Sequence, residues 1–333
     1  MQFSLTPDLL FNTRQSRQNA TLRNRLDTVG QEVITGRTSD VIGATKGRTG
    51  DAFLIRKAGA DVERFRDTAG LAKARISAAS LSVSVVRESL STLSATGRVS
   101  LAQGSERDLN EMAETAADLL NQSMSALNRR SGSRHLFSGT QTAGAPLAEA
   151  QTLRTAVDGL ISAAPDAASA IAAVNDYFDA PGGGFETDIY QGSTADGPRL
   201  HVTDTQSYDP LPKADDPVLR DVMKGYALIA GASQIADDTQ RRAVMEEGLN
   251  LLDGSLGDMI AMETRLGAIE QSVERIEEGF SREASVIAAA ENAMLGVDTF
   301  DAAAELQALQ SQLEASYTVT GRLGSLSLAN FLR

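Results

Sequence analysis

Two long apolar stripes with heptad spacing lie in the two halves of this 333-residue chain. A repeat that averages 3.5 residues keeps one apolar edge of a slightly underwound helix facing a partner helix, so both stripes predict coiled-coil packing. As a single helix the second stripe would be about 60 Å long at about 1.5 Å per residue, which is typical of rods and fibrous assemblies. The first stripe, with alternating steps of three and four, is Val62, Phe65, Ala69, Ala72, Ile76, Ala79, Val83, Val86, Leu90 and Leu93. The second, with steps of seven, is Leu252, Met259, Leu266, Val273, Phe280, Ile287 and Met294.

The composition favours thin helical layers and argues against catalysis. Hydrophobic residues make up 42% of the chain, which excludes a wholly disordered protein, but aromatic residues are only 5% and Trp is absent. Cys is also absent, so disulfides and Cys-based metal or thiol sites are impossible. His135 and His201 have no carboxylate or second His at ligand spacing, so we expect them to be packing or surface residues. No nucleophile, base and orienting group can be assembled, and we therefore expect no enzyme, no bound metal and no cofactor.

Charge is divided unevenly along the chain. Residues 1–145 hold 19 Lys and Arg against 14 Asp and Glu, a balance of +5, and residues 146–333 hold 12 against 30, a balance of −18, which together give −13. An acidic total argues against a nucleic-acid partner, because phosphate contacts need clustered basic residues. Two interpretations of the division stay open: a basic N-terminal segment that lies against an acidic C-terminal one, or solvated helix faces without pairing.

The N-terminal residues show no export or membrane signal. Residues 1–7 have neither a basic region nor a continuous apolar region, so they are not a Sec-type signal peptide. No stretch approaches the roughly 18 apolar residues that a membrane span needs. We expect no membrane insertion, and a different route if the protein is exported.

Helical periodicity and glycine-rich breaks divide the chain. We expect a first helix that fails near Gly36, a second that ends around residues 97–104, and a third over residues 109–127 that Ser- and Gly-rich segments stop. In the middle, helical pieces over 153–163 and 167–177 precede two expected short strands, 185–189 and 200–203, and helices resume at Val218. Because neither stripe can be buried alone, the helical arms at the two ends of the chain must pack against each other. The predicted fold class is mainly α: a long antiparallel helical coiled-coil rod formed by both chain ends, with a small mixed α/β domain inserted in the middle.

An amphipathic stripe also continues into the last residues of the chain, where ends are normally frayed and polar. Apolar spacing that continues to the end of the chain indicates that this helix is buried against a partner, and the N-terminal amphipathic helix is the natural partner. We therefore expect helix-on-helix burial between subunits. The residues predicted for this assembly interface are Leu22, Leu26, Val29, Val33, Leu306, Leu309, Leu313, Tyr317 (or the adjacent Ser316), Leu323, Leu326, Leu328 and Phe331.

Several segments have a familiar pattern. Residues 33–37 (VITGR) end the first helix with Gly and Arg, residues 128–142 read NRRSGSRHLFSGTQT, and residues 190–192 read YQG. Residues 301–332 form the C-terminal helix, which ends in SLSLANFL. These segments resemble the bacterial flagellin superfamily, and within it the hook–filament junction proteins (hook-associated protein 3). Residues 38–51 depart from the Asn-Ser-Pro/Ala-x-Asp-Asp run typical of the superfamily, and the final Arg333 is more similar to flagellin itself.

The resemblance implies a domain organisation. Residues 1–45 and 285–333 would form an inner coiled-coil domain, residues 46–144 and 218–284 a helical rod domain, and residues 145–217 a mixed outer domain.

It also implies a function: a structural axial protein of the bacterial flagellum, an adaptor that joins hook-associated proteins to the flagellin filament by packing its terminal helices. Such a protein would be secreted through the flagellar type III export apparatus and would lie in the extracellular flagellum. Its partners would be neighbouring copies, the hook-side junction protein, flagellin and a cytosolic export chaperone that binds the C-terminal helix.

Other interpretations remain beside this one. Flagellin, the filament subunit, is the nearest alternative, although the LFSGT segment and the short middle argue against it. A cytosolic coiled-coil scaffold would show similar heptads, and an enzyme hidden in residues 140–215 is a third possibility. For residues 62–93 and 252–280, the heptads are interpreted as core positions of one helical domain rather than as an assembly surface.

Overall fold

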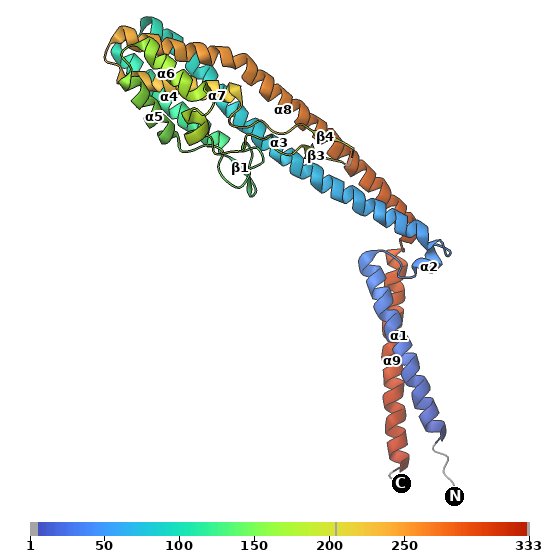
Figure 1. Cartoon of the computed structure of the whole chain (residues 1–333). Coiled ribbons are helices and arrows are strands. Elements are labelled where there is room, and N and C mark those ends of the chain that lie inside the picture. Colours follow the sequence, from blue (N-terminus) through green and yellow to red (C-terminus); the bar gives the residue numbers. More distant parts are fainter. Residues whose placement is uncertain (1–5, 204, 332–333) are drawn as a thin grey trace. The chain divides into compact units, whose positions relative to one another are not determined.

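The computed structural model describes residues 6–203 and 205–331, with the side chains of 6–12 and 323–331 left out (Figure 1). The described part is mainly α with long helices and two small sheets, as the heptad stripes predict. Its α-helices are α1 (Thr6–Thr35), α2 (Val41–Ala44), α3 (Thr49–Gln103), α4 (Glu106–Leu127), α5 (Ala150–Ala163), α6 (Ala167–Asp179), α7 (Pro217–Gly231), α8 (Asp238–Leu295) and α9 (Thr299–Phe331). Short π- and 3₁₀-helical turns are η1 (Phe185–Ile189) and η2 (Ala232–Gln234). The strands are β1 (Arg130–Ser131), β2 (Arg134–His135), β3 (Leu200–His201) and β4 (Ser207–Tyr208).

The chain divides into two compact units. Residues 1–64 and 280–333 form the first, here called the terminal unit, and residues 65–279 form the second, called the bundle unit. The terminal unit therefore combines an N-terminal segment with a C-terminal one, and the bundle unit contains most of α3 and of α8, so the two helical ends of the sequence meet as predicted.

Helices α3 and α8 run antiparallel through the bundle unit and bury their heptad stripes (Figure 1). From Ala69 to Leu93 every member of the first stripe is buried, as are the first four members of the second, from Leu252 to Val273. Burial of apolar area at roughly 25 cal/mol per Å² is the main favourable term for such a pair. These stripes are core positions of a helical domain, in agreement with the sequence-based interpretation.

Ion pairs flank the α3–α8 seam, with the cations on α3 and the anions on α8. Lys73 Nζ lies 3.0 Å from Glu274 Oε1, and Arg87 Nε lies 2.5 Å from Glu263 Oε2. Near the other end, Arg98 pairs with Asp253. The pairing interpretation of the uneven charge division therefore holds for these two helices.

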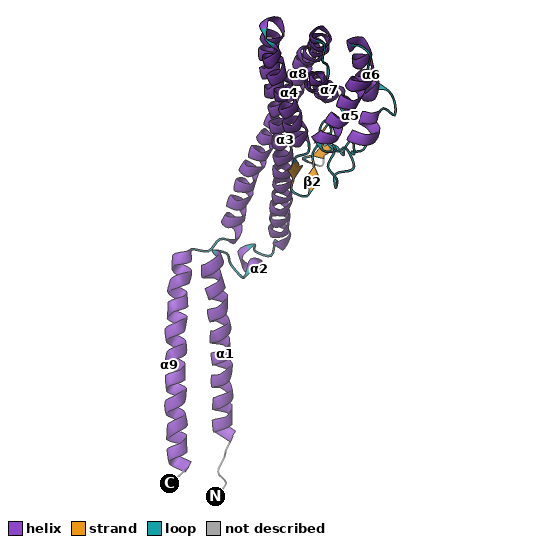
Figure 2. Ribbon diagram, turned by 90° about the vertical axis from the view of Figure 1, so that its left-hand side faces the viewer, coloured by secondary structure: helices purple, strands orange, loops and turns teal. Residues whose placement is uncertain are grey.

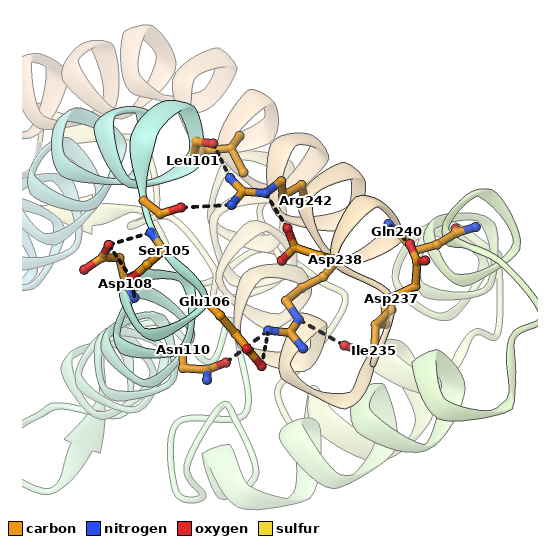
Figure 3. A network of polar contacts seen from close by, with 12 residues as sticks. Leu101, Ser105, Glu106, Asp108, Asn110, Ile235, Asp237, Asp238, Gln240 and Arg242 are labelled. Atoms are coloured by element: carbon orange, nitrogen blue, oxygen red, sulfur yellow. Dashed lines mark hydrogen bonds and ion pairs between the residues drawn. The ribbon is translucent and has the colours of Figure 1, made fainter.

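Two arginines tie the corner between α3 and α4 to the start of α8 (Figure 3). Arg242 donates hydrogen bonds to the carbonyl oxygens of Leu101, at 2.6 Å, and Gly104, at 2.9 Å. These carbonyls lie at the C-terminal end of α3, where the last turn has no intrahelical donors. The buried Arg241 donates to the carbonyl of Ile235 at 3.0 Å and reaches Asn110 on α4. These hydrogen bonds hold the corner between α3 and α4 against the start of α8.

Helix α4 begins at the same corner with a reciprocal cap (Figure 3). The Ser105 amide donates to Asp108 Oδ2 at 2.6 Å, and the Asp108 amide donates to Ser105 Oγ at 3.4 Å. This capping box satisfies donors that the first turn of a helix leaves free. The hydrogen bonds from Ser105 lower the pKa of the Asp108 carboxyl below its usual range.

Residues 185–189, predicted as a strand, instead form the π-helical turn η1. The turn is closed by the amide of Tyr190, which donates to the carbonyl of Phe185 at 2.7 Å. Phe185 stacks on Phe178 of α6, with ring centroids 5.1 Å apart. A Cβ at Gly184 would overlap the ring of Tyr177, so a glycine is needed for this close approach. The strand prediction was wrong because it rested on the alternating pattern of apolar residues, which aromatic packing and the glycine turn override.

The second predicted strand, residues 200–203, exists in part but has a different partner. Strand β3 pairs antiparallel with β4, with Leu200 opposite Tyr208 and His201 opposite Ser207. A separate hairpin pairs β1 with β2, with Arg130 opposite His135. The inserted residues 145–217 are therefore mixed, with helices α5 and α6 and the β3–β4 hairpin, and the β1–β2 hairpin lies before them.

Helix α3 is long and rich in apolar residues. In the part of the chain that the structure describes, it is the one helix long and apolar enough by length and composition to cross a membrane. This corrects the expectation that no segment reaches that level. Its apolar positions, such as Ile76 and Val83, are core positions of the bundle unit, which gives the same composition.

Candidate assembly interface

Helices α1 and α9 lie side by side and antiparallel in the terminal unit (Figures 1 and 2). Val29 is fully buried between them, and the Cβ that Gly30 lacks would lie 3.8 Å from Leu306 Cδ1. The predicted residues on this seam are half-buried rather than buried, because each helix has a single partner: Leu22, Leu26, Val33, Leu306, Leu309 and Leu313. The structure thus brings both predicted sets together within one chain.

Polar side chains extend the seam toward the chain ends. Gln15 Nε2 donates to Ser316 Oγ at 3.3 Å and to Thr320 Oγ1 at 3.2 Å. Ser316 Oγ donates to Asn19 Oδ1 at 2.5 Å. Of the two neighbouring candidates for the seam, Ser316 therefore lies in it.

Tyr317 lies beside the seam and is 42% exposed. Its hydroxyl accepts a hydrogen bond from Arg23 Nε at 2.6 Å, and the Arg23 guanidinium carbon is 5.4 Å from the ring centroid. Arg25 makes a further ion pair with Glu305 at 2.9 Å, with about half of each side chain exposed. Exposed pairs of this kind contribute roughly 0–1 kcal/mol, so they specify register more than stability.

Large apolar side chains remain exposed on the terminal unit. Ile34 is 84% exposed and Phe300 80% exposed, and Phe53 reaches 68%. Val319, near the end of the described side chains of α9, is 49% exposed. Exposed apolar side chains of this size are candidates for an interaction surface.

A compact joint closes the base of the helix pair. Gly36 ends α1 with a φ of +66°, and its carbonyl accepts a hydrogen bond from the Val297 amide at 3.0 Å. In return, the Thr38 amide donates to the carbonyl of Leu295 at 2.8 Å. Asp298 then starts α9 by accepting from the Phe300 amide at 2.8 Å. The helix break predicted near Gly36 and the break at residues 295–298 are therefore joined by backbone hydrogen bonds.

Two nearly buried glutamates organise this joint. Glu291 forms ion pairs with Arg37, at 2.8 Å, and with Arg56, at 3.3 Å, and only 11% of its side chain is exposed. Glu32 accepts from the Ser39 amide at 2.7 Å. Sequence reasoning missed both residues: the partners of Glu291 are more than 200 positions away and leave no local spacing signal, and Glu32 bonds to irregular backbone just after the helix, which follows no helical period. Charged residues that flank the glycine break at Gly36 were the only available hint.

The remaining predicted interface residues fall outside the described side chains. Leu323, Leu326, Leu328 and Phe331 belong to the last part of α9, for which the structure gives the helix but no side-chain contacts. Their assignment to the interface stays a prediction.

The C-terminal helix of this pair belongs to a segment that matches a known protein family. Residues 249–332 match the family model for the bacterial flagellin C-terminal helical region. This segment is similar to the C-terminal helical region of bacterial flagellins. It includes α9 and most of α8, and therefore every C-terminal residue predicted for the assembly interface.

Flagellar proteins also share the fold. The crystal structure of FlgL from Bacillus cereus is 16% identical in sequence and superposes with a TM-score of 0.54, covering 72% of this chain and 98% of FlgL. A Vibrio parahaemolyticus structure assigned to a flagellar hook-associated protein is 14% identical, with a TM-score of 0.54, and covers 73% of this chain and 96% of its own. No curated protein matches this sequence at a significant level.

Proposed function

We propose that this chain is a structural axial protein of the bacterial flagellum and serves as an adaptor between hook-associated proteins and the flagellin filament. The observation that carries the proposal is the terminal unit: a flagellin C-terminal helix packed on the N-terminal helix, with apolar residues left half-covered or exposed on both. Neighbouring copies would cover these residues in the assembled tube. The role is mechanical and needs no catalytic group.

The five-segment organisation is part of the proposal. Residues 1–45 and 285–333 would line the inner tube, residues 46–144 and 218–284 would form the rod in its wall, and residues 145–217 would face outward. The buried α3–α8 seam supports a stiff wall, because its core is closed within one chain.

A junction role is favoured over a filament role by length and fold. Nearly the whole of FlgL, 98% of its chain, superposes on this one, so few of its residues lack an equivalent here. The partners would be neighbouring copies, the hook-side junction protein and flagellin. Export through the flagellar type III apparatus, with a cytosolic chaperone on α9, would bring the chain to the extracellular flagellum.

The proposal is tested in cells that lack this protein. Cells given a chain that ends at Asp298, without α9, should secrete flagellin into the medium but build no filaments, as seen by electron microscopy. Normal filaments in these cells would contradict the proposal. A matched pair of point variants refines the test: Ile34→Asp, on the terminal unit, should impair filaments, and Leu81→Asp, an exposed residue of the bundle unit, should not.

A further inference from the structure

A small pocket in the bundle unit is lined by three basic side chains. Arg75 comes from α3, and Arg134 and His135 come from β2. Leu136, Leu200 and Leu211 supply apolar walls. Among the residues that the structure describes, no acidic side chain lines this pocket. Here it is called the basic pocket.

The positive charge of the basic pocket has no internal partner. Within the described ranges, neither the Arg75 nor the Arg134 guanidinium makes an ion pair or a hydrogen bond. By contrast Lys73, two residues before Arg75 on α3, is paired with Glu274 and Glu277. Two unpaired arginines at one hollow are notable in a chain of net charge −13.

His135 is held in a defined orientation at the pocket. Its Nδ1 lies 2.9 Å from the carbonyl oxygen of Asn128, which can only accept, so Nδ1 carries a proton. Its backbone amide donates to the carbonyl of Thr142 at 2.9 Å. One hydrogen bond therefore orients the ring and the other fixes the backbone that carries it, before any ligand binds.

The wall beside these residues is a close approach of two backbone segments. Gly139 has a φ of +62°, and a Cβ there would lie 2.5 Å from the carbonyl oxygen of Ala195 and 2.7 Å from that of Ser193. The Ser193 amide donates to the Ser138 carbonyl at 3.0 Å and locks the two segments together. Only glycine is compatible with this geometry, so the pocket is built rather than left by loose loops.

We propose that the basic pocket binds a carboxylate, supplied by an Asp or Glu side chain of a neighbouring protein chain. The planar fork of a guanidinium matches the two oxygens of a carboxylate, and two such groups at one pocket make a strong anion site. The free space is about 50 Å³, room for about three water-sized groups, which suits a carboxylate and its methylene rather than a nucleotide. The assignment to a protein side chain rests on the proposed function, since an axial protein has other chains as its neighbours.

The test uses the purified full-length chain and three probes. Arginine Nε and histidine ring signals are followed by nuclear magnetic resonance during titration with a capped glutamate peptide, with sodium acetate and with inorganic phosphate. We expect saturable shifts of the Arg75, Arg134 and His135 signals, with the glutamate peptide binding more tightly than acetate because its chain contacts the apolar walls. These measurements need no flagellum, so their outcome is independent of filament formation.

Variants assign the shifts to the pocket. Arg75→Gln and Arg134→Gln should each weaken peptide binding at least tenfold, and the control Arg107→Gln, an exposed arginine of α4 outside the pocket, should leave it unchanged. Thermal unfolding of each variant verifies that it folds. No saturable shift with any probe would overturn the site. Tighter binding of phosphate would overturn the carboxylate assignment, and equal binding of acetate would overturn the assignment to a protein side chain.

Discussion

At the scale of single residues, burial separates similar side chains on one helix. On α8, Leu266 is 3% exposed and Ile260 is 48% exposed, although both are branched aliphatic residues only six positions apart. Leu266 belongs to the heptad stripe and Ile260 does not. The cost of placing a charge at each position should therefore differ by several kcal/mol.

Leu266→Asp should lower the free energy of unfolding of the bundle unit by about 3 kcal/mol or more, because a carboxylate without a partner would be buried among apolar side chains. Ile260→Asp is the matched control and should change stability by no more than about 0.5 kcal/mol. Urea denaturation of the purified proteins measures both. Equal stability of the two variants would mean that the α8 stripe is not a core.

A second residue links stability to pH. Burial raises the pKa of Asp253, but hydrogen bonds from Ser94 and Arg98 outweigh it, and the pKa lies below its usual range. A carboxyl with a lowered folded pKa stabilises the protein above the unfolded pKa, and this stabilisation is lost as pH falls through the folded value. Asp253→Asn should therefore destabilise the protein more at pH 7 than at pH 3, by urea denaturation. An equal loss at both pH values for Asp253→Asn would refute the argument.

At the scale of elements, charge sorting specifies which helices pair. Along the seam α3 supplies Lys73, Arg87 and Arg98, and α8 supplies the acidic partners. Two copies of α3 packed together would place like charges opposite one another, which costs free energy. The heptad stripe gives each helix an apolar face that can pack on another helix, and the charges favour the pairing of α3 with α8.

A charge swap tests this selection. Arg87→Glu alone and Glu263→Arg alone should each destabilise the protein by about 1 kcal/mol, because each leaves like charges face to face across a partly exposed seam. The double variant, with both changes, should recover most of the loss, as measured by a double-mutant cycle of unfolding free energies. Additive losses in the double variant would show that the two side chains do not interact.

Elements that follow one simple period could be predicted from the sequence. The α3 and α8 stripes and the helix break at Gly36 depend on local spacing, so they were found. The π-helical turn at Phe185–Ile189 was not, because its alternation is overridden by the Phe178 ring and by Gly184. The Glu291 joint and the basic pocket combine residues far apart in sequence, so no spacing rule reveals them.

At the scale of the whole molecule, the two units differ in how well each buries its own residues. In the bundle unit the core is continuous from α3 through α4 and α7 to α8. In the terminal unit, the described side chains of α1 and α9 include only Val29, Glu32 and Ala302 as buried ones. A helix pair with so little core gains little to offset roughly 1–2 kcal/mol of backbone ordering per residue.

Hydrogen exchange on the dilute monomer should reveal this difference directly. Amides of residues 65–90 and 255–279 should exchange slowly, because they open only when the bundle unit unfolds, and amides of residues 13–33 and 305–320 should exchange within seconds. Once copies assemble, the exposed Ile34 and Phe300 would be covered, and protection of α1 and α9 should rise by orders of magnitude. Strong protection of both helices in a verified monomer would instead mean that they form a self-contained pair, which is what a cytosolic coiled-coil scaffold requires. The exchange rate of α1 and α9 before and after assembly therefore discriminates between the axial and the scaffold interpretations.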